Sequence, residues 1–173
     1  MNDQPSSHAT NVNPTIERQS KVPNEDSWSE LRCIDPGEPP LTGYLQLCAD
    51  RRFHKCIQDQ FQADAELDSH YAYWIHADAG GTPKMECQRT APDYCYYDKC
   101  VRLMGWSAHG DGCGGFGPDV PDAVIRAALD VISRRKVEEY PDADHFVYFA
   151  TLIKKGDAEE AVVYCRKYAK KAA

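Results

Sequence analysis

Hydrophobic residues fall into short runs separated by longer amphipathic or polar segments. The short runs are rich in β-branched and aromatic residues, and Gly, Pro or charged residues interrupt the chain around them, a pattern typical of buried strands. They predict four strands, at residues 43–48, 71–75, 99–106 and 145–153.

The segments between and after these runs show a period closer to that of a helix. Phe53, Ile57, Phe61 and Ala65 recur at every fourth position, which predicts a helix over residues 53–68. Two more helices are predicted: one begins near residue 120, and one occupies residues 157–168. In the first of these helices, Pro121 is the starting signal and the predicted apolar face is Val124, Ala128, Val131 and Ile132. In the second, Asp157 and Glu160 are the starting signals and the predicted apolar face is Ala161, Tyr164, Cys165 and Tyr168.

Strands that alternate with helices favour an α/β fold. We expect a mostly parallel sheet of about four to five strands, flanked by helices on both faces. Residues 1–28 are polar, rich in Asn, Ser and Pro, and without periodicity, so they predict a disordered tail. Residues 29–173 then suit a single domain.

Composition excludes several function classes. The 173 residues include 20 Lys and Arg against 27 Asp and Glu, and the resulting net charge of −7 argues against a nucleic-acid partner. No run approaches the roughly 20 apolar residues of a membrane-spanning helix. The first residues lack the basic and apolar regions of a secretory signal, so we expect a cytoplasmic protein. The acidic net charge leads us to expect a small, uncharged substrate.

Cysteine is over-represented, with eight residues in the chain. Thiols stay reduced in the cytoplasm, which favours metal ligands, nucleophiles or buried small side chains over disulfides. Because the count is even, a disulfide framework stays open as an alternative.

Polar clusters follow three of the predicted strands, where parallel strands place functional loops. Cys48 ends the first strand, and His109 and Cys113 follow the third. If these strands are neighbours, two thiolates and one imidazole meet, a ligand set that suits zinc and leaves a fourth position for water. Asp50 and Arg52 lie on the same side of an extended segment as Cys48, so Arg52 would hold an ionised Asp50 beside the metal.

These residues resemble the β-class carbonic anhydrases. The resemblance covers about residues 40–155 and is carried by Cys48-x-Asp50-x-Arg52, the Ala79-Gly80-Gly81 turn, and His109 and Cys113 ahead of Gly114-Gly115. It implies a zinc enzyme, usually dimeric, that hydrates carbon dioxide to bicarbonate, with Cys48, His109 and Cys113 on the metal and Asp50 and Arg52 as the catalytic pair. The family usually has His-x-x-Cys, whereas this chain has His-x-x-x-Cys with Gly112 as the apparent extra residue.

Other interpretations stay open from sequence. The same fold would serve a hydrolase of carbonyl sulfide or carbon disulfide, or a non-catalytic zinc-binding assembly protein. Cobalt or cadmium would also fit the ligand set. Three cysteines and one histidine could form a second metal site: His76, Cys87, Cys95 and Cys100. For His54 and Cys56, a structural role is favoured over metal binding.

Overall fold

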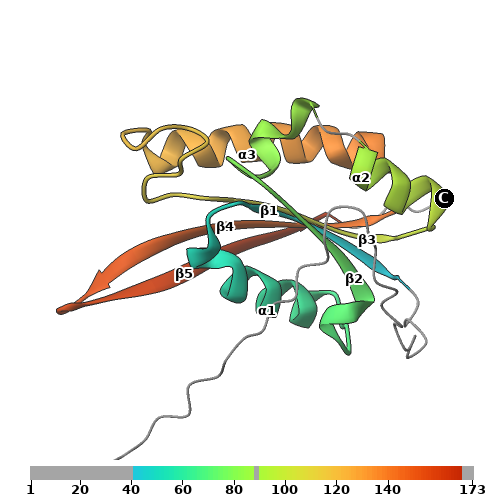
Figure 1. Cartoon of the computed structure of the whole chain (residues 1–173), viewed down its shortest axis with the longest axis horizontal. Coiled ribbons are helices and arrows are strands. Elements are labelled where there is room, and N and C mark those ends of the chain that lie inside the picture. Colours follow the sequence, from blue (N-terminus) through green and yellow to red (C-terminus); the bar gives the residue numbers. More distant parts are fainter. Residues whose placement is uncertain (1–40, 88–89, 169–173) are drawn as a thin grey trace, which may run out of the picture. The chain divides into compact units, whose positions relative to one another are not determined.

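A five-stranded sheet in the order β2-β1-β3-β4-β5 organises the structure (Figure 1). The computed structural model describes residues 41–87 and 90–168, so the predicted tail over residues 1–28 lies outside the described residues. The strands are β1 (Gly43–Cys48), β2 (Tyr73–Asp78), β3 (Leu103–His109), β4 (Asp144–Lys155) and β5 (Ala158–Tyr168). The helices and helical turns are η1 (Arg51–Phe53), α1 (His54–Asp64), η2 (His70–Ala72), η3 (Thr82–Cys87), α2 (Thr90–Asp93), η4 (Tyr94–Asp98) and α3 (Asp122–Glu139).

The first four strands of the sheet are parallel, and β5 is antiparallel to β4. All six residues of β1 are buried, because parallel strands on both sides and packed side chains above and below cover it completely. The predicted α/β class with a mostly parallel sheet is confirmed. The second and third strands lie a few residues further along the chain than their hydrophobic runs predicted.

Helices cover both faces of the sheet (Figure 1). On one face, Phe53, Ile57 and Phe61 pack against Leu45 and Leu47 of β1. On the other face, α3 packs against a cluster that includes Met104, Trp106, Val147 and Phe149. No helix within residues 41–87 and 90–168 is long and apolar enough to cross a membrane.

The C-terminal helix predicted over residues 157–168 is wrong, because this segment is strand β5. Gly156 has a φ of +66° in a two-residue turn, and Lys155 pairs directly with Ala158. The hairpin gives the backbone of β4 a partner, and the β-branched Val162 and Val163 suit a strand. Pairing to an open sheet edge therefore overrode the local helix-start signals of Asp157 and Glu160.

Helix α3 exists, but its predicted apolar face is mostly wrong. Val124 and Val131 are 53% and 64% exposed, and only Ile132 of the predicted four is buried. The buried positions are Ile125, Leu129, Ile132, Ser133 and Lys136. Lys136 can face inward because its ammonium pairs with Glu139 at 2.6 Å and lies over the rings of Trp106 and Tyr140.

The loops that carry the predicted site leave the carboxyl ends of neighbouring strands. Strand β1 pairs with β2 on one side and β3 on the other, so the chain reverses its direction of winding at β1. The loop after β1 leads into α1 on one face of the sheet, and the loop after β3 leads into α3 on the opposite face. Such a switch point opens a crevice at the carboxyl edge, where α/β proteins bind ligands.

Candidate metal centre

Three potential metal ligands meet at this edge of the sheet. Cys48 is the last residue of β1, His109 is the last of β3, and Cys113 lies four residues further along the loop toward α3. Their ligand atoms all lie within 4.8 Å of one another, and the three residues are buried. The structure therefore brings together the three residues that the sequence predicted, and they are the only such group among the described residues.

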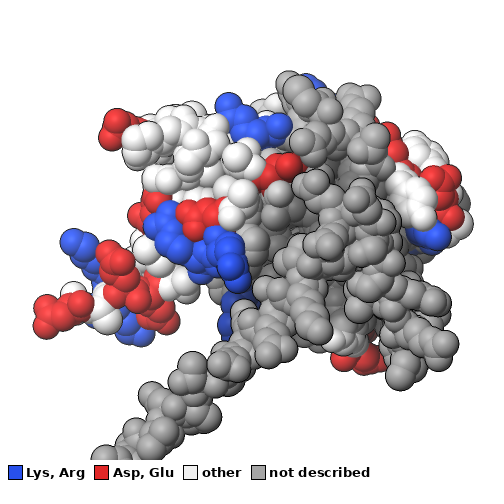
Figure 2. All heavy atoms as spheres, viewed as in Figure 1, with Lys and Arg blue, Asp and Glu red and all other residues white. Residues whose placement is uncertain are grey.

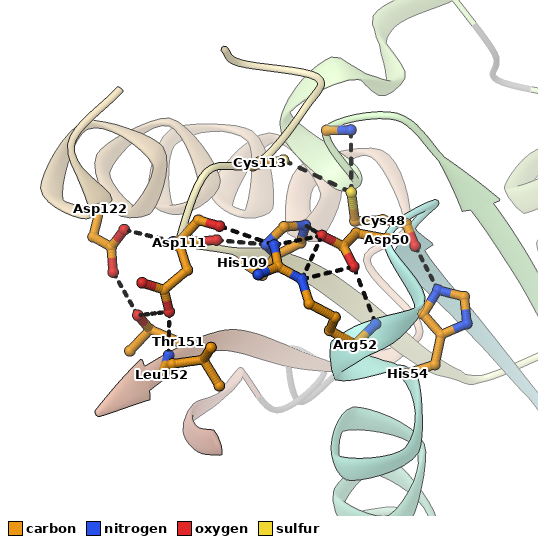
Figure 3. Close-up of polar contacts among 12 residues, drawn as sticks. Cys48, Asp50, Arg52, His54, His109, Asp111, Cys113, Asp122, Thr151 and Leu152 are labelled. Atoms are coloured by element: carbon orange, nitrogen blue, oxygen red, sulfur yellow. Dashed lines mark hydrogen bonds and ion pairs between the residues drawn. The ribbon is translucent and has the colours of Figure 1, made fainter. Parts of the chain in front are cut away.

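The sulfur atoms have the separation that a tetrahedral zinc requires. Two zinc–sulfur bonds of about 2.3 Å at the tetrahedral angle place their sulfurs about 3.8 Å apart. Cys48 Sγ and Cys113 Sγ are 3.7 Å apart (Figure 3). No large rearrangement of the two side chains would be needed to bind the ion.

The histidine is oriented for the same role. His109 Nδ1 lies 2.6 Å from the carbonyl oxygen of Gly110, which places the proton on Nδ1 and the lone pair on Nε2. The ring stacks on Phe53 with 4.8 Å between centroids, and only 1% of the residue is exposed. Nε2 is buried without a hydrogen-bond partner, which is costly for a polar atom unless a cation occupies the site.

Electrostatics favour one thiolate in this cluster. Burial opposes ionisation of the Cys48 thiol, but the adjacent His109 imidazole and the backbone N–H groups of Asp50 and Gly80 outweigh it and lower its pKa to about 7. Burial, together with the neighbouring Cys48, raises the pKa of Cys113. A bound cation would displace the remaining thiol proton, as metal binding to thiols does.

The Ala79-Gly80-Gly81 turn supports Cys48. Gly80 N–H donates to Cys48 Sγ at 3.3 Å. Gly80 and Gly81 have φ values of +92° and +62°, which glycine adopts without strain. A Cβ at Gly115 would come within 2.3 Å of Gly80 N, so the turn and the loop after His109 fit closely only because Gly115 lacks a side chain.

Asp50 and Arg52 form a tight pair beside the three ligands (Figure 3). Arg52 Nη2 donates to Asp50 Oδ2 at 2.6 Å, and Arg52 Nε donates to both carboxylate oxygens at 3.1 and 3.0 Å. Asp50 Oδ2 is 3.7 Å from His109 Nε2. Hydrogen bonds from Arg52 lower the pKa of Asp50 to about 2 despite its partial burial, so it stays a carboxylate.

The pair forms for a different reason from the predicted one. The sequence argument placed residues 48, 50 and 52 on one side of an extended segment, but β1 ends at Cys48 and Arg52 lies in the helical turn η1. Asp50 is the N-cap of that turn and accepts a hydrogen bond from Arg52 N at 3.1 Å. The cap, rather than strand alternation, brings the two side chains together.

Other predicted polar residues serve the scaffold. His54 Nε2 lies 2.6 Å from the carbonyl oxygen of Cys48 and steadies the end of β1. Cys56 donates to the carbonyl oxygen of Phe53 at 3.1 Å. Both contacts agree with the structural placement favoured from sequence.

The remaining cysteines do not join the centre. Cys95 is buried, and burial raises its pKa to about 11, whereas Cys100 and Cys165 are exposed. All six cysteines with described side chains are free thiols, so the structure offers no support for the disulfide alternative within this part of the chain. The Cys87 side chain, which the possible second metal site included, lies outside the described residues together with Cys33.

Several groups that support Cys48, His109 and Arg52 were not predicted from the sequence. They are the backbone N–H of Gly80, the ring of Phe53 and the backbone carbonyl of Asp111, which accepts from Arg52 Nη2 at 2.9 Å. Backbone groups carry no residue-specific signal, and only the positive-φ preference of glycine pointed to the turn that presents Gly80 N–H.

Comparison with known proteins identifies no relative. No family model matches the chain, and no curated protein matches it.

Proposed function

We propose that this protein is a zinc-dependent carbonic anhydrase that interconverts carbon dioxide and bicarbonate. The supporting observation is the convergence of Cys48 Sγ, His109 Nε2 and Cys113 Sγ beside an Asp50 carboxylate that Arg52 holds in place. Three protein ligands are the number found in catalytic zinc sites, whereas structural sites usually have four. A bound zinc ion would supply the acidified water that hydration of carbon dioxide requires.

The chain's own residues would orient the reactants. Asp50 stays ionised, so it can accept a hydrogen bond from a water molecule near His109 but cannot donate one. Arg52 uses Nε and Nη2 on Asp50, which fixes the direction of the carboxylate lone pairs. Phe53 covers one face of the His109 ring and excludes water from that side. The product proton would leave to solvent through the exposed side of the Asp50–Arg52 pair.

Zinc is the proposed ion because its preferences match the ligands. Two sulfurs and one imidazole nitrogen are borderline to soft donors, and the 3.7 Å sulfur separation fits tetrahedral bonds. Thiolate ligands and free cysteines both suit the reducing cytoplasm that we propose as the location.

Metal content and activity measured on the same samples test the function. Wild-type protein should bind one zinc per chain and hydrate carbon dioxide in a stopped-flow pH-indicator assay. Cys48→Ser and His109→Ala should lose both properties. Cys165→Ser is the matched control, because it removes an exposed thiol outside the centre and should keep both.

Two outcomes would replace the proposal with an alternative. Sulfide release from carbonyl sulfide or carbon disulfide, with negligible hydration of carbon dioxide, would assign the hydrolase. Tightly bound zinc with no turnover of any of the three substrates would assign a non-catalytic zinc-binding protein. Full hydration activity in both ligand variants would refute a metal mechanism at this site.

We also propose that the protein is a homodimer that pairs along β2. This strand is one edge of the sheet, and Trp74 and Ile75 are 47% and 39% exposed there. The opposite edge, β5, carries charged side chains that discourage pairing, and both signs of charge intermix at the β4–β5 tip (Figure 2). The exposed charged residues of β5 are Glu159, Glu160, Arg166 and Lys167.

Light scattering after size-exclusion chromatography tests the dimer. The wild-type protein should have twice the mass of one chain at micromolar concentration. Ile75→Lys should give monomer, because a charge would be buried at the paired edge. Val131→Lys, on the exposed side of α3, is the control and should stay dimeric. A monomeric wild type would contradict the proposal.

A further inference from the structure

The loop between β3 and α3 is tied to β4 by a hydrogen-bond network (Figure 3). The Asp111 carboxylate accepts from the backbone N–H of Leu152, and its Oδ2 lies 3.2 Å from the Thr151 hydroxyl oxygen, whose single proton it shares with Asp122. The carboxylate of Asp122, the first residue of α3, accepts from Asp111 N at 3.1 Å and from Thr151 Oγ1 at 2.6 Å. The loop is therefore held from two separate elements. We call Asp111, Asp122 and Thr151 the Asp122 network.

Asp122 lies directly against the loop backbone. A Cβ at Gly110 would come 2.1 Å from Asp122 Oδ1, so this carboxylate occupies the space that a side chain at Gly110 would need. Gly110 N–H also donates to the carbonyl oxygen of Ala150 at 2.9 Å. The backbone between His109 and Asp111 is thus clamped between the start of α3 and β4.

The clamped residue reaches the candidate metal centre through its carbonyl group. Arg52 Nη2 donates one hydrogen to Asp50 Oδ2 at 2.6 Å and the other to the carbonyl oxygen of Asp111 at 2.9 Å. The second bond ties the guanidinium to the loop after β3 as well as to Asp50. The Arg52 side chain is 47% exposed, so a contact to the loop after β3 adds an anchor to a guanidinium that solvent can reach.

The turn between His109 and Cys113 presents this carbonyl to Arg52. Asp111 and Gly112 have φ values of +50° and +70° in succession, and this turn lets the Asp111 carboxylate reach β4 while its carbonyl reaches Arg52. Asp111 adopts the left-handed conformation, which Asp tolerates better than most non-glycine residues. The hydrogen bonds of the Asp122 network hold it there.

We propose that Asp122 is a positioning residue that fixes Asp111, whose carbonyl orients Arg52 and thereby aims Asp50 at the metal centre. Its effect on turnover rests on the proposed function, whereas its effect on Arg52 does not. Asp122 touches neither the three ligands nor Asp50 in the structure. It acts through two steps, from its carboxylate to the Asp111 backbone and from the Asp111 carbonyl to the Arg52 guanidinium.

The Nε–H of Arg52 reports this coupling directly by NMR. In zinc-loaded wild-type protein, this proton should give a sharp, slowly exchanging signal, which Arg52→Lys assigns by its loss. Asp122→Ala should broaden the signal or speed its exchange at least tenfold while zinc stoichiometry stays at one. Asp122→Asn keeps an acceptor oxygen and should restore the signal. Asp119→Ala, an exposed acid in the same loop, should leave it unchanged.

Turnover supplies the second measurement. Asp122→Ala should lower kcat for carbon dioxide hydration about tenfold with little change in KM, as loss of an orienting contact behind a metal site does. Asp122→Asn should recover to within about threefold of wild type. If the wild type hydrates no carbon dioxide, the proposed function fails, and the NMR measurement alone decides the positioning role.

Thr151→Val keeps the inference testable if Asp122→Ala does not fold. It removes the hydroxyl shared by both carboxylates with little change in shape, and it should broaden the Arg52 signal while zinc stays bound. An unchanged Arg52 Nε–H signal in folded Asp122→Ala would refute the positioning role. So would an unchanged signal in Thr151→Val when Asp122→Ala cannot be studied.

Discussion

Replacing Gly115 by alanine should damage the candidate metal centre from behind. The new Cβ would come within 2.3 Å of Gly80 N and 2.5 Å of the carbonyl carbon of Ala79, both backbone atoms that a rotamer change cannot move. The Ala79-Gly80-Gly81 turn must therefore shift away from the loop. Such a shift would pull the Gly80 N–H from Cys48 Sγ, which it now contacts at 3.3 Å.

Two separate effects give the expected magnitude. Overpacking of this kind lowers the free energy of unfolding by about 1–3 kcal/mol. Losing a hydrogen bond to a charged sulfur costs about 1.5–3 kcal/mol. Because each 1.4 kcal/mol is a factor of ten, this second loss should weaken zinc binding about 10- to 100-fold.

Gly114→Ala is a matched control one residue away. A Cβ at Gly114 meets no atom within 4 Å, so the free energy of unfolding should change by less than about 0.5 kcal/mol. Urea denaturation of the metal-free protein measures stability, and competition with a zinc chelator measures affinity. Equal effects of the two substitutions, or a Gly115→Ala protein with wild-type zinc affinity, would refute the proposed packing of the turn behind Cys48.

Three further predictions concern the scaffold. Trp106→Phe should lower the free energy of unfolding, measured by urea denaturation, by about 1–3 kcal/mol. The reason is that Trp106 Nε1 donates to the buried His145 Nδ1 at 2.9 Å, and the substitution leaves that nitrogen without its donor. A loss below about 0.5 kcal/mol would contradict this. Burial lowers the pKa of His145 below its usual 6.5, so as the pH falls the unfolded chain binds the extra proton before the folded chain does. Stability should therefore fall as the pH drops below about 6.5. Urea midpoints at pH 7 and pH 5 check this, and His145→Gln should show a shallower pH dependence. Gly156→Ala should cost about 1 kcal/mol by thermal denaturation because of the φ of +66°, with a smaller loss for Gly156→Asn, and a stabilised alanine variant would argue against the hairpin turn.

The three candidate metal ligands were predictable because their identity is chemical and their placement follows from topology. Cys48 ends an apolar run that predicts a buried strand, and His109 and Cys113 follow another such run. Once both strands join one parallel sheet, their carboxyl ends must meet at the same edge. That β1 and β3 are neighbours was a condition of the argument, and the sheet order fulfils it.

The Asp122 network left no trace in the sequence pattern. Asp111 and Asp122 are 11 residues apart, and Thr151 is 29 residues further along the chain. Aspartates before a helix and within a glycine-rich loop are common for local reasons. Their contact depends on where the loop, α3 and β4 meet, which no local signal encodes.

The buried positions were also predicted correctly in some segments and wrongly in others. The run Gly43–Cys48 was assigned correctly because a strand covered on both faces is apolar at nearly every position, whatever its neighbours are. The face of α3 was misassigned because a lysine predicts a solvent-facing position, whereas the Trp106 and Tyr140 rings receive the Lys136 ammonium in the interior. Residues 157–168 became a strand because β4 offered unpaired backbone groups. The sequence by itself determined the α/β class and the chemistry of the three candidate metal ligands, since both depend on residue types along short segments. The tertiary structure decided the helix face, the last strand and the support behind Arg52, since these depend on contacts between segments far apart in the chain.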